Sequence, residues 1–440
     1  MKVLLVGGGG REHAIAKALA RSRADLYAVM GNRNPGIARA AKEVRIHDVT
    51  DVPTITAWAK AQGIDLAVIG PEAPLAAGIV DSLEAAGVPT VGPDREAAKL
   101  ETSKEFARDL MRDHRIPGLV EYWAFDRLED FQAWLRTCDF EFVIKPIGLT
   151  GGKGVQVWGD HFRTKAGAEA YAKQVLANRV GGAARFLVEE KMVGEEFSLQ
   201  ALCDGSRLVP CPLAQDHKRA FENDEGPNTG GMGSYSDANH LLPFLTRADF
   251  EAALGTMRAT VAAMETRGTP FKGVLYGGFM ATRDGVRLLE YNVRFADPEC
   301  MNVLPILEDD FRELCERLVD GTLPAAVRFA RKATVCKYVV PPGYGTAPKA
   351  GQVLEVDEPA IARTGAELYY AAVDEREGHV VTTTSRALAV VGVADSIEQA
   401  EATAEGGLRR IRGDFSVRHD IGTAASLRRK LERMRALRSL

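Results

Sequence analysis

Long apolar runs are missing from this 440-residue sequence. No stretch approaches the ~18 residues of a membrane span, and the opening KVLLV is too short for the core of a signal peptide. An excess of charge is also missing, because 56 basic and 60 acidic residues leave a formal net charge of −4. This balance gives no general attraction to nucleic acid or to a membrane. We therefore expect a cytoplasmic protein with small-molecule partners, while the sequence leaves its oligomeric state open.

Closely paired cysteines are absent as well. The six cysteines are scattered without a C-x-x-C pair, which argues against a zinc site or a disulfide framework. The length of the chain and its 46% hydrophobic content indicate a globular protein of about two to four domains.

The early segment KVLLVGGGGREHA lacks the third glycine of a dinucleotide-binding turn. When the Gly-x-Gly-x-x-Gly pattern is started at Gly7 or Gly8, its last position holds Glu12 or His13. No acidic residue ends the second predicted strand, which runs into GNRNPG. A glycine turn between a strand and a helix still suits the phosphate of a small molecule, with Arg11 and His13 as donors. A tight turn without a ligand is the alternative.

Short apolar strands alternate with helical patterns up to about residue 95. They cover residues 3–6, 26–30, 66–69 and 90–91. This alternation predicts a parallel sheet with helices on both faces, and such sheets bind ligands at the carboxyl ends of their strands. Three of these ends carry the loops GGGGREH, GNRNPG and GPEAPLAAG, so we expect one site there. Glu72 would hold ribose hydroxyls or an amine, or would only favour a helix start.

The segment from about 120 to 330 has longer alternating strands, and DG pairs at 204–205 and 284–285 predict hairpins in an antiparallel region. Within it, FVIKPIGLTGGKGVQVW places Lys145 before a glycine loop and a second strand. This order predicts a flap over nucleotide phosphates, or a glycine-rich hairpin with exposed lysines. Downstream, RFLVEEKMVGEEFSLQ suggests a hinge that reads adenine, with Glu195 or Glu196 reaching the ribose.

The segment RLLEYNVRFADPE carries the strongest polar pattern. In a strand over 287–295, alternation places Leu288, Glu290, Asn292 and Arg294 on one face. Buried polar groups need partners, and Mg²⁺ prefers oxygen ligands that it shares with substrate phosphates. Arg294 would then clamp a carboxylate or the transferred phosphoryl group. A solvated strand face is the alternative.

The final segment predicts a separate small α/β unit. Its strands are ATVCKYVV and RALAVVGVA, with a helix over 397–411. The last residues, SLRRKLERMRALRSL, have apolar positions three or four apart and predict an amphipathic helix. Those positions are Leu427, Leu431, Met434, Leu437 and Leu440. This helix would pack on its own domain or contact another subunit.

Six segments together resemble the phosphoribosylamine-glycine ligase family of the ATP-grasp superfamily. They are VGGGGREHA, GPEAPLAAGIVDSL, KLETSKEFARDLM, GLTGGKGV, AQDHKRAFENDEGPNTGGMGSYS and EYNVRFADPE. The resemblance implies a multidomain α/β and α+β fold: a doubly wound parallel-sheet domain (1–100), a linker helix with the first ATP-grasp lobe (101–190), a second lobe with the metal site (191–328) and a small α/β C-terminal domain (329–440).

The resemblance also implies an ATP-dependent ligase of purine biosynthesis that joins glycine to 5-phosphoribosylamine through a glycyl phosphate. Its first domain would hold the phosphoribosylamine. The ATP site would comprise Lys104, Lys145, Gly151, Gly152, Lys153, Gly154, Glu189, Glu190, Lys191, Val193 and Glu196. Substrates would contact Gly9, Gly10, Arg11, Glu12, Asn34, Pro71, Glu72, His217, Asn228 and Gly230. Catalysis would use Arg294, Asp216 and Lys218, and Glu290 and Asn292 would bind Mg²⁺ or Mn²⁺.

The sequence departs from the family pattern at three places. Ile147 stands where an aspartate is common, Ala296 replaces a glycine, and VLYGGFMA beside the metal strand offers no third carboxylate. We expect metal affinity to depend more heavily on nucleotide phosphates. The alternatives are another ATP-grasp enzyme of purine synthesis, a nucleotide-binding regulator without catalysis, and a dinucleotide-dependent oxidoreductase.

Overall fold

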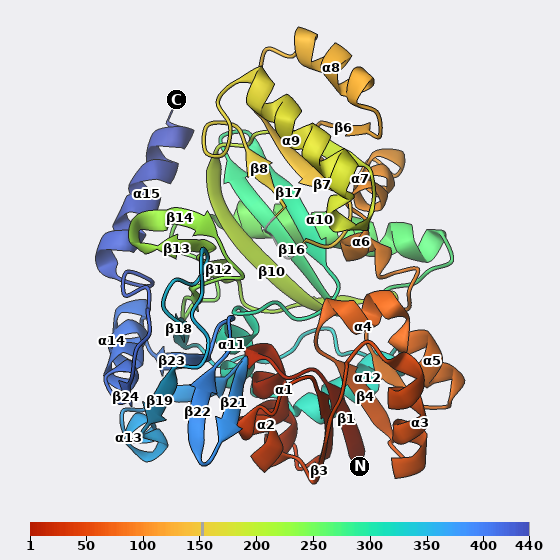
Figure 1. The fold of residues 1–440 in the computed structure, drawn as a ribbon. Helices are drawn as coiled ribbons and strands as arrows, with labels where there is room; N and C mark the ends of the chain where they lie inside the picture. Colours follow the sequence, from red (N-terminus) through yellow and green to blue (C-terminus); the bar gives the residue numbers. More distant parts are fainter. Residues whose placement is uncertain (151–153, 440) are drawn as a thin grey trace.

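The structure is a computed structural model that describes residues 1–150 and 154–439. Its N-terminal part is the predicted parallel sheet, at the lower right of Figure 1, with strand order β3-β2-β1-β4-β5. The strands are β1 (Lys2–Val6), β2 (Asp25–Met30), β3 (Glu43–Ile46), β4 (Leu66–Ile69) and β5 (Thr90–Val91). The apolar runs of β1 and β4 are fully buried because helices cover the sheet.

The helices around this sheet form two groups, since α1 packs against α2 and α3 packs against α5. They are α1 (Gly10–Arg21), α2 (Pro35–Ala40), α3 (Val52–Gln62), α4 (Glu72–Ala77) and α5 (Ile79–Ala85). Helix α1 begins at Gly10, the last of the four consecutive glycines. The Glu12 side chain caps the Gly9 amide and so closes the first turn early.

Two short helices, α6 (Lys99–Thr102) and α7 (Lys104–Asp113), lead into the first lobe at the top of Figure 1. The lobe is an antiparallel sheet of order β6-β9-β7-β8 with helices α8 (Leu128–Thr137) and α9 (Lys165–Asn178). Its strands are β6 (Tyr122–Phe125), β7 (Phe142–Pro146), β8 (Gln156–Val157) and β9 (Phe186–Glu190). Strands β7 and β8 pair antiparallel, which confirms the predicted strand-loop-strand order of the flap.

The second lobe is an antiparallel sheet of order β11-β10-β16-β17 in the middle of Figure 1. Its strands are β10 (Gly194–Asp204), β11 (Leu208–Pro210), β16 (Lys272–Thr282) and β17 (Gly285–Asn292). Both predicted DG hairpins are confirmed by the antiparallel pairs β10–β11 and β16–β17. Helices of this region are α10 (Arg247–Thr266), α11 (Cys300–Val303) and α12 (Phe311–Val319).

The C-terminal segment shares a sheet with two short strands of the segment before it. The sheet order is β12-β15-β18-β23-β20, in which β12 (Gln215–Asp216) and β15 (Gly233–Ser236) come from the preceding segment. The C-terminal strands are β18 (Ala333–Val339), β20 (Glu367–Tyr370) and β23 (Leu388–Ala394). This pairing joins residues about 100 apart, and local patterns do not reveal it.

The remaining C-terminal elements form a smaller sheet and two helices. The sheet has the order β21-β22-β19-β24, and the helices are α13 (Glu358–Arg363) and α14 (Ile397–Leu408). Its strands are β19 (Val353–Val356), β21 (Val373–Arg376), β22 (His379–Thr382) and β24 (Ile411–Arg412). The predicted helix over 397–411 is thus confirmed, with an end three residues earlier.

The predicted amphipathic tail is confirmed as α15 (Ala424–Arg438), which runs up the left side of Figure 1. It packs against β10 and β16 of the second lobe, with Met434 buried and Leu427, Leu431 and Leu437 partly buried. Leu440 lies outside the described residues. The tail therefore joins the C-terminal domain to the second lobe.

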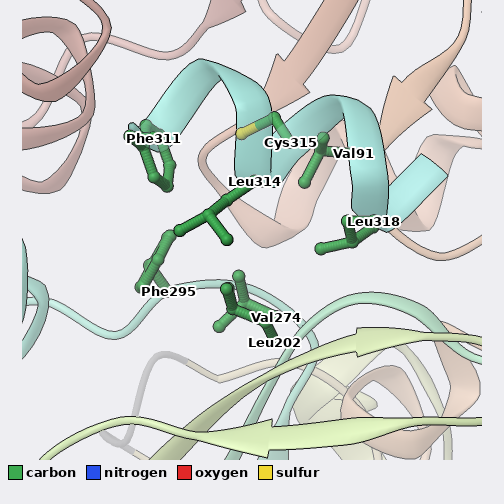
Figure 2. Close-up of a pocket in the computed structure, with 8 residues that line it drawn as sticks. All are labelled: Val91, Leu202, Val274, Phe295, Phe311, Leu314, Cys315 and Leu318. Atoms are coloured by element: carbon green, nitrogen blue, oxygen red, sulfur yellow. The ribbon is translucent and has the colours of Figure 1, made fainter. Parts of the chain in front are cut away.

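A small cavity lies where α12 faces the strands of two domains (Figure 2). Phe311, Leu314 and Leu318 of α12 line it, opposite Val91 of β5 and Val274 of β16. This lining is apolar, so the cavity belongs to the interdomain core and offers no group that would hold a phosphate. Within the described residues, no helix is both long and apolar enough to cross a membrane.

Candidate active site

Strand β17 presents the predicted metal ligands, but its alternation is broken by a bulge. Glu290 lies opposite Gly278 of β16, whereas Leu288 lies opposite the next residue, Phe279, so Leu289 is an extra residue. Leu288 consequently faces the core and does not share a face with Glu290, which corrects the sequence-based assignment. Bulges commonly re-aim side chains beside active sites, and this one places Leu288 and Glu290 on opposite faces of β17.

Cations surround the carboxylate of Glu290. Lys218 Nζ lies 3.8 Å from Glu290 Oε1 and 3.0 Å from Glu196 Oε2, and the Glu290 side chain is 39% exposed. Burial opposes ionisation of Glu290, but the positive charges of Lys218, Lys145 and Lys104 outweigh it and lower its pKa. An ionised, partly open carboxylate with three lysines nearby suits a site for phosphates and a cation.

A buried carboxylate holds Lys145 in place. Glu189 Oε2 lies 2.6 Å from Lys145 Nζ, and the guanidinium of Arg108 donates to both oxygens of Glu189 at 2.8 and 3.1 Å. Burial opposes ionisation of Glu189, but Arg108 and Lys145 lower its pKa to about 2. These contacts engage the carboxylate within the protein and favour a positioning role over direct contact with the nucleotide. Lys104 reaches the base of the flap, where its Nζ donates to Gly148 O at 2.8 Å.

The predicted hinge lies between β9 and β10, and the two candidate ribose-binding glutamates, Glu195 and Glu196, follow it. Lys191 Nζ donates to Trp158 O at 2.9 Å and to Glu141 at 2.8 Å, while Val193 is 53% exposed. Glu190 is exposed at the end of β9. Glu195 is buried against α15, with Arg433 NH1 3.2 Å from its Oε1. Glu196 lies next to it in sequence and pairs with Lys218 instead.

The flap glycine Gly154 is buried, and its carbonyl oxygen accepts a hydrogen bond from Tyr171 at 2.6 Å. The predictions for Gly151, Gly152 and Lys153 lie outside the described residues.

Arg294 lies just beyond β17 between two carboxylates. Its Nε is 3.4 Å from Glu72 Oε2, and its NH2 is 3.1 Å from Glu101 Oε1. Burial opposes ionisation of Glu72, but Arg294 and Arg11 hold its pKa at about 2. Glu72 is the first residue of α4, next to Pro71, and its side chain is 34% exposed. The structure thus brings Glu72 and Arg294 together although they are distant in sequence.

The side chains predicted at the glycine turn mostly shape the turn itself. Glu12 accepts from the Gly9 amide and from Arg11 Nε, both at 2.6 Å, and Arg11 NH1 donates to Phe295 O at 3.1 Å. Asn34 is fully buried, donates to Gly8 O at 3.0 Å and caps α2. These contacts engage Glu12, Asn34 and two of the three guanidinium nitrogens of Arg11 within the protein. The close approach of Gly10 to the Tyr338 hydroxyl also leaves no room for a side chain there.

The loop that follows β12 supplies the remaining predicted residues. Asp216 Oδ1 and both ring nitrogens of His217 are buried without a hydrogen-bond partner among the described residues. Burial and the nearby Glu299 raise the pKa of Asp216, and burial followed by Lys430 lowers the pKa of His217 to about 3. The loop then forms the hairpin of β13 (Arg219–Phe221) and β14 (Glu225–Asn228). Asn228 thus ends β14, and Gly230 follows it.

Sequence reasoning missed four residues that the structure places around this site. Arg386, which lies in the C-terminal segment, donates to Gly231 O and to Asp297 O, both at 3.1 Å. It thereby holds the loop that follows β14. The Asp297 carboxylate accepts from Tyr338 Oη at 2.6 Å, while Glu299 is buried near Asp216. Glu101 contacts Arg294. Glu101, Asp297 and Glu299 stand inside the quoted motifs, but no local signal marks Arg386.

The end of β17 offers ligands for a divalent cation that nucleotide phosphates would also bind. The Asn292 amide nitrogen, in the orientation that satisfies its neighbours, donates to Glu101 Oε1 at 3.0 Å and to Tyr291 O at 3.1 Å. The amide oxygen is then available beside the ionised Glu290. No group of three acidic, histidine or cysteine side chains in residues 1–150 and 154–439 could hold a metal alone. Two hard oxygen ligands completed by phosphates and water are typical of Mg²⁺.

Family models match three consecutive parts of the chain. They are the phosphoribosylglycinamide synthetase N domain over residues 1–101, its ATP-grasp (A) domain over 102–300 and its C domain over 334–424. Phosphoribosylamine--glycine ligase of Thermococcus kodakarensis is 52% identical over 438 residues, which is 100% of each chain. The enzyme of the same name from Methanothermobacter thermautotrophicus is 49% identical over 440 residues, again 100% of each chain.

Solved structures agree with these matches. A crystal structure of phosphoribosylamine--glycine ligase from Thermotoga maritima is 25% identical, has a TM-score of 0.82 and covers 96% of this chain and 100% of that chain. The biotin carboxylase domain of Hydrogenobacter thermophilus 2-oxoglutarate carboxylase, solved with MgADP and bicarbonate, has a TM-score of 0.73 at 14% identity. That match covers 99% of this chain and 93% of the other, and it supports the fold alone.

Proposed function

The chain belongs to the phosphoribosylglycinamide synthetase family, and on this premise we propose how its site works. It is an ATP-dependent ligase of purine biosynthesis that joins glycine to 5-phosphoribosylamine. The observation that carries this conclusion is the match to relatives over the whole chain, together with the lysines around Glu290. A dinucleotide-dependent oxidoreductase or a regulator without catalysis would need neither feature.

The reaction proceeds in two steps that need different groups. A carboxylate oxygen of glycine attacks the γ-phosphorus of ATP, so ADP leaves and glycyl phosphate forms. The amine nitrogen of phosphoribosylamine then attacks the carbonyl carbon, inorganic phosphate leaves, and the nitrogen gives up a proton. The first step brings two anions together, which accords with the positive charges of Lys104, Lys145 and Lys218 acting on Glu290.

Arg294 and Glu72 stand where the two substrates would meet. Arg294 would hold the glycine carboxylate and later the transferred phosphoryl group. Glu72 starts a helix at the carboxyl edge of the N-terminal sheet, and its exposed fraction is large enough for it to take the amine or a ribose hydroxyl. Asp216 and His217, buried with unpartnered polar atoms, would line the pocket for glycine.

Glu290 and the oxygen of Asn292 would hold Mg²⁺ or Mn²⁺. A bound divalent cation supplies charge neutralisation for the β- and γ-phosphate oxygens. Glu196, Val193 and Lys191 would border the nucleoside of ATP, and the flap between β7 and β8 would exclude water from the acyl phosphate, which otherwise hydrolyses. ATP and phosphorylated intermediates belong to the cytoplasm, and we place the enzyme there.

ADP formation tests this function when each substrate is omitted in turn. With ATP, Mg²⁺, glycine and phosphoribosylamine present, ADP and glycinamide ribonucleotide should form in equal amounts. Without glycine, ADP should fall to background because no carboxylate can attack. Without phosphoribosylamine, at most about one ADP per site should appear, because water is excluded from the acyl phosphate. Full ADP production without glycine would contradict the proposed reaction.

A further inference from the structure

Glu101 lies behind the end of β17 and contacts three consecutive residues there. Its Oε2 accepts from the Val293 amide at 2.7 Å, and its Oε1 lies 3.1 Å from Arg294 NH2. With the Asn292 amide turned so that both of its ends meet suitable partners, Oε1 also accepts from the amide nitrogen at 3.0 Å. Glu101 belongs to α6, 192 residues earlier in the chain, and its side chain is only 5% exposed. One buried carboxylate therefore connects α6 to the end of β17.

The contact with Asn292 decides which end of that amide faces the cleft. An amide offers a donor at nitrogen and an acceptor at oxygen, and only the oxygen can bind a cation. Glu101 and the carbonyl of Tyr291 are both acceptors, so they hold the nitrogen on the buried side. The amide oxygen then points to the same side of β17 as the Glu290 side chain.

The contact with Arg294 fixes a second group of the site. Arg294 has two carboxylate neighbours, and they differ in exposure, since Glu72 is 34% exposed and Glu101 is 5% exposed. A substrate can replace the exposed Glu72 contact, whereas the buried Glu101 contact stays. Arg294 can thus bind an incoming anion without losing its orientation or leaving a buried charge unpaired.

We propose that Glu101 is a positioning residue that sets the metal-binding end of Asn292 and the orientation of Arg294. It contacts neither metal nor substrate and acts through these two side chains. The inference rests on the proposed function, because it assumes a cation at Glu290 and Asn292. Helix α6 ends two residues before Lys104, so the same short segment carries both this carboxylate and a lysine of the phosphate site. Groups behind a ligand commonly orient it in this way.

Binding of Mn²⁺ tests the inference without catalysis. The free Mn²⁺ signal in electron paramagnetic resonance is measured with full-length enzyme and a non-hydrolysable ATP analogue. In Glu101→Gln, the new NH₂ group would face the donors of Asn292 and Arg294, so the Asn292 amide should turn its nitrogen to the cleft. Mn²⁺ affinity should fall about 10- to 100-fold. Glu96→Gln is the matched control, because Glu96 forms an exposed ion pair with Lys99 nearby and should bind Mn²⁺ like wild type.

A double-mutant cycle shows whether Glu101 acts through Asn292. Adding Glu101→Gln to Asn292→Ala should weaken Mn²⁺ binding no further than Asn292→Ala alone, because the amide to be oriented is gone. If Glu101→Gln fails to fold, Glu101→Asp keeps the charge but shortens its reach, and it should show a smaller loss of affinity. Wild-type affinity in folded Glu101 variants, or additive losses in the cycle, would overturn the inference. Failure of the wild type itself to bind Mn²⁺ with the analogue would instead count against the proposed metal site.

Discussion

The carboxylate of Glu189 illustrates how a single buried residue arranges the proposed ATP site. It lies between Arg108 and Lys145 and has almost no exposure. The sequence placed it in the adenine hinge because it ends an apolar strand, and the pattern did not show which cations would meet it. Buried carboxylates need such partners, so the contact explains why a charged residue is tolerated there.

Glu189→Leu should therefore destabilise the protein by about 3–5 kcal/mol, because two buried cations lose their counter-charge. A lowered thermal melting temperature, measured without ligands, is the readout. Glu190→Leu changes the exposed neighbour on the same strand and should leave the melting temperature nearly unchanged. If Glu189→Leu melts like wild type and only the KM for ATP rises, Glu189 reads the nucleotide and the positioning role is wrong.

For Glu290, the expected loss is in activity and not in stability. Glu290→Gln keeps the shape of the side chain and removes the charge that meets Lys218 and the cation. Turnover should fall at least about 100-fold, while the melting temperature changes little because the side chain is partly exposed. A melting loss typical of a core deletion, with activity retained, would contradict the metal assignment.

Two of the predicted substrate residues lie on the hairpin of β13 and β14 or on the loop after it. Arg386 holds the loop at Gly230 and Gly231, and Arg418 donates to Arg219 O at 3.1 Å and to Asp224 at 2.8 Å. Both arginines come from the C-terminal domain. This domain thus fixes the shape of a loop that belongs to the second lobe.

Arg386→Met should loosen that loop and lower kcat/KM for glycine about 10- to 100-fold, since hydrogen bonds from a charged group are lost. The KM for ATP should change much less, because the nucleotide residues lie on other elements. Arg376→Met, on the exposed end of β21, is the control and should behave like wild type. Equal losses for glycine and ATP would indicate general unfolding instead of a local effect on the loop.

Local patterns predicted the elements well where one signal dominated. The buried strands of the N-terminal sheet and the DG hairpins were found because their apolar runs and turn residues lie close in sequence. Strand β3 was missed, since EVRI carries two charges and lies at the sheet edge. The bulge at Leu289 and the contact of Glu101 with β17 depend on partners far along the chain, which one sequence does not reveal.

Helix α15 joins two domains. Arg438 forms two hydrogen bonds with Asp249 of α10, at 2.6 and 2.9 Å, and Arg433 pairs with Glu195 of β10. The apolar side of the helix packs on the second lobe. Of the two alternatives that the sequence left for this tail, the structure shows packing within the chain, although on the neighbouring lobe and not on the C-terminal domain alone.

Deleting residues 426–440 should therefore lower the melting temperature by several degrees without changing the number of subunits in the particle in solution. A point variant separates packing from charge: Met434→Ala should cost about 2–5 kcal/mol because Met434 is buried. Arg435→Ala, on the exposed side of the same helix, should cost almost nothing. A particle with fewer subunits after the deletion, with an unchanged melting temperature, would instead identify α15 as a subunit contact.

If the site activates glycine by phosphoryl transfer, an oxygen atom of glycine must end up in inorganic phosphate, and an isotope label can follow it. Glycine labelled with ¹⁸O in its carboxylate is converted with ATP and phosphoribosylamine, and the inorganic phosphate is analysed by mass spectrometry. If glycyl phosphate forms, one labelled oxygen should appear in phosphate for each amide made, because the carboxylate oxygen that attacks phosphorus leaves with it. Unlabelled phosphate, with label only in the amide and in residual glycine, would contradict the account.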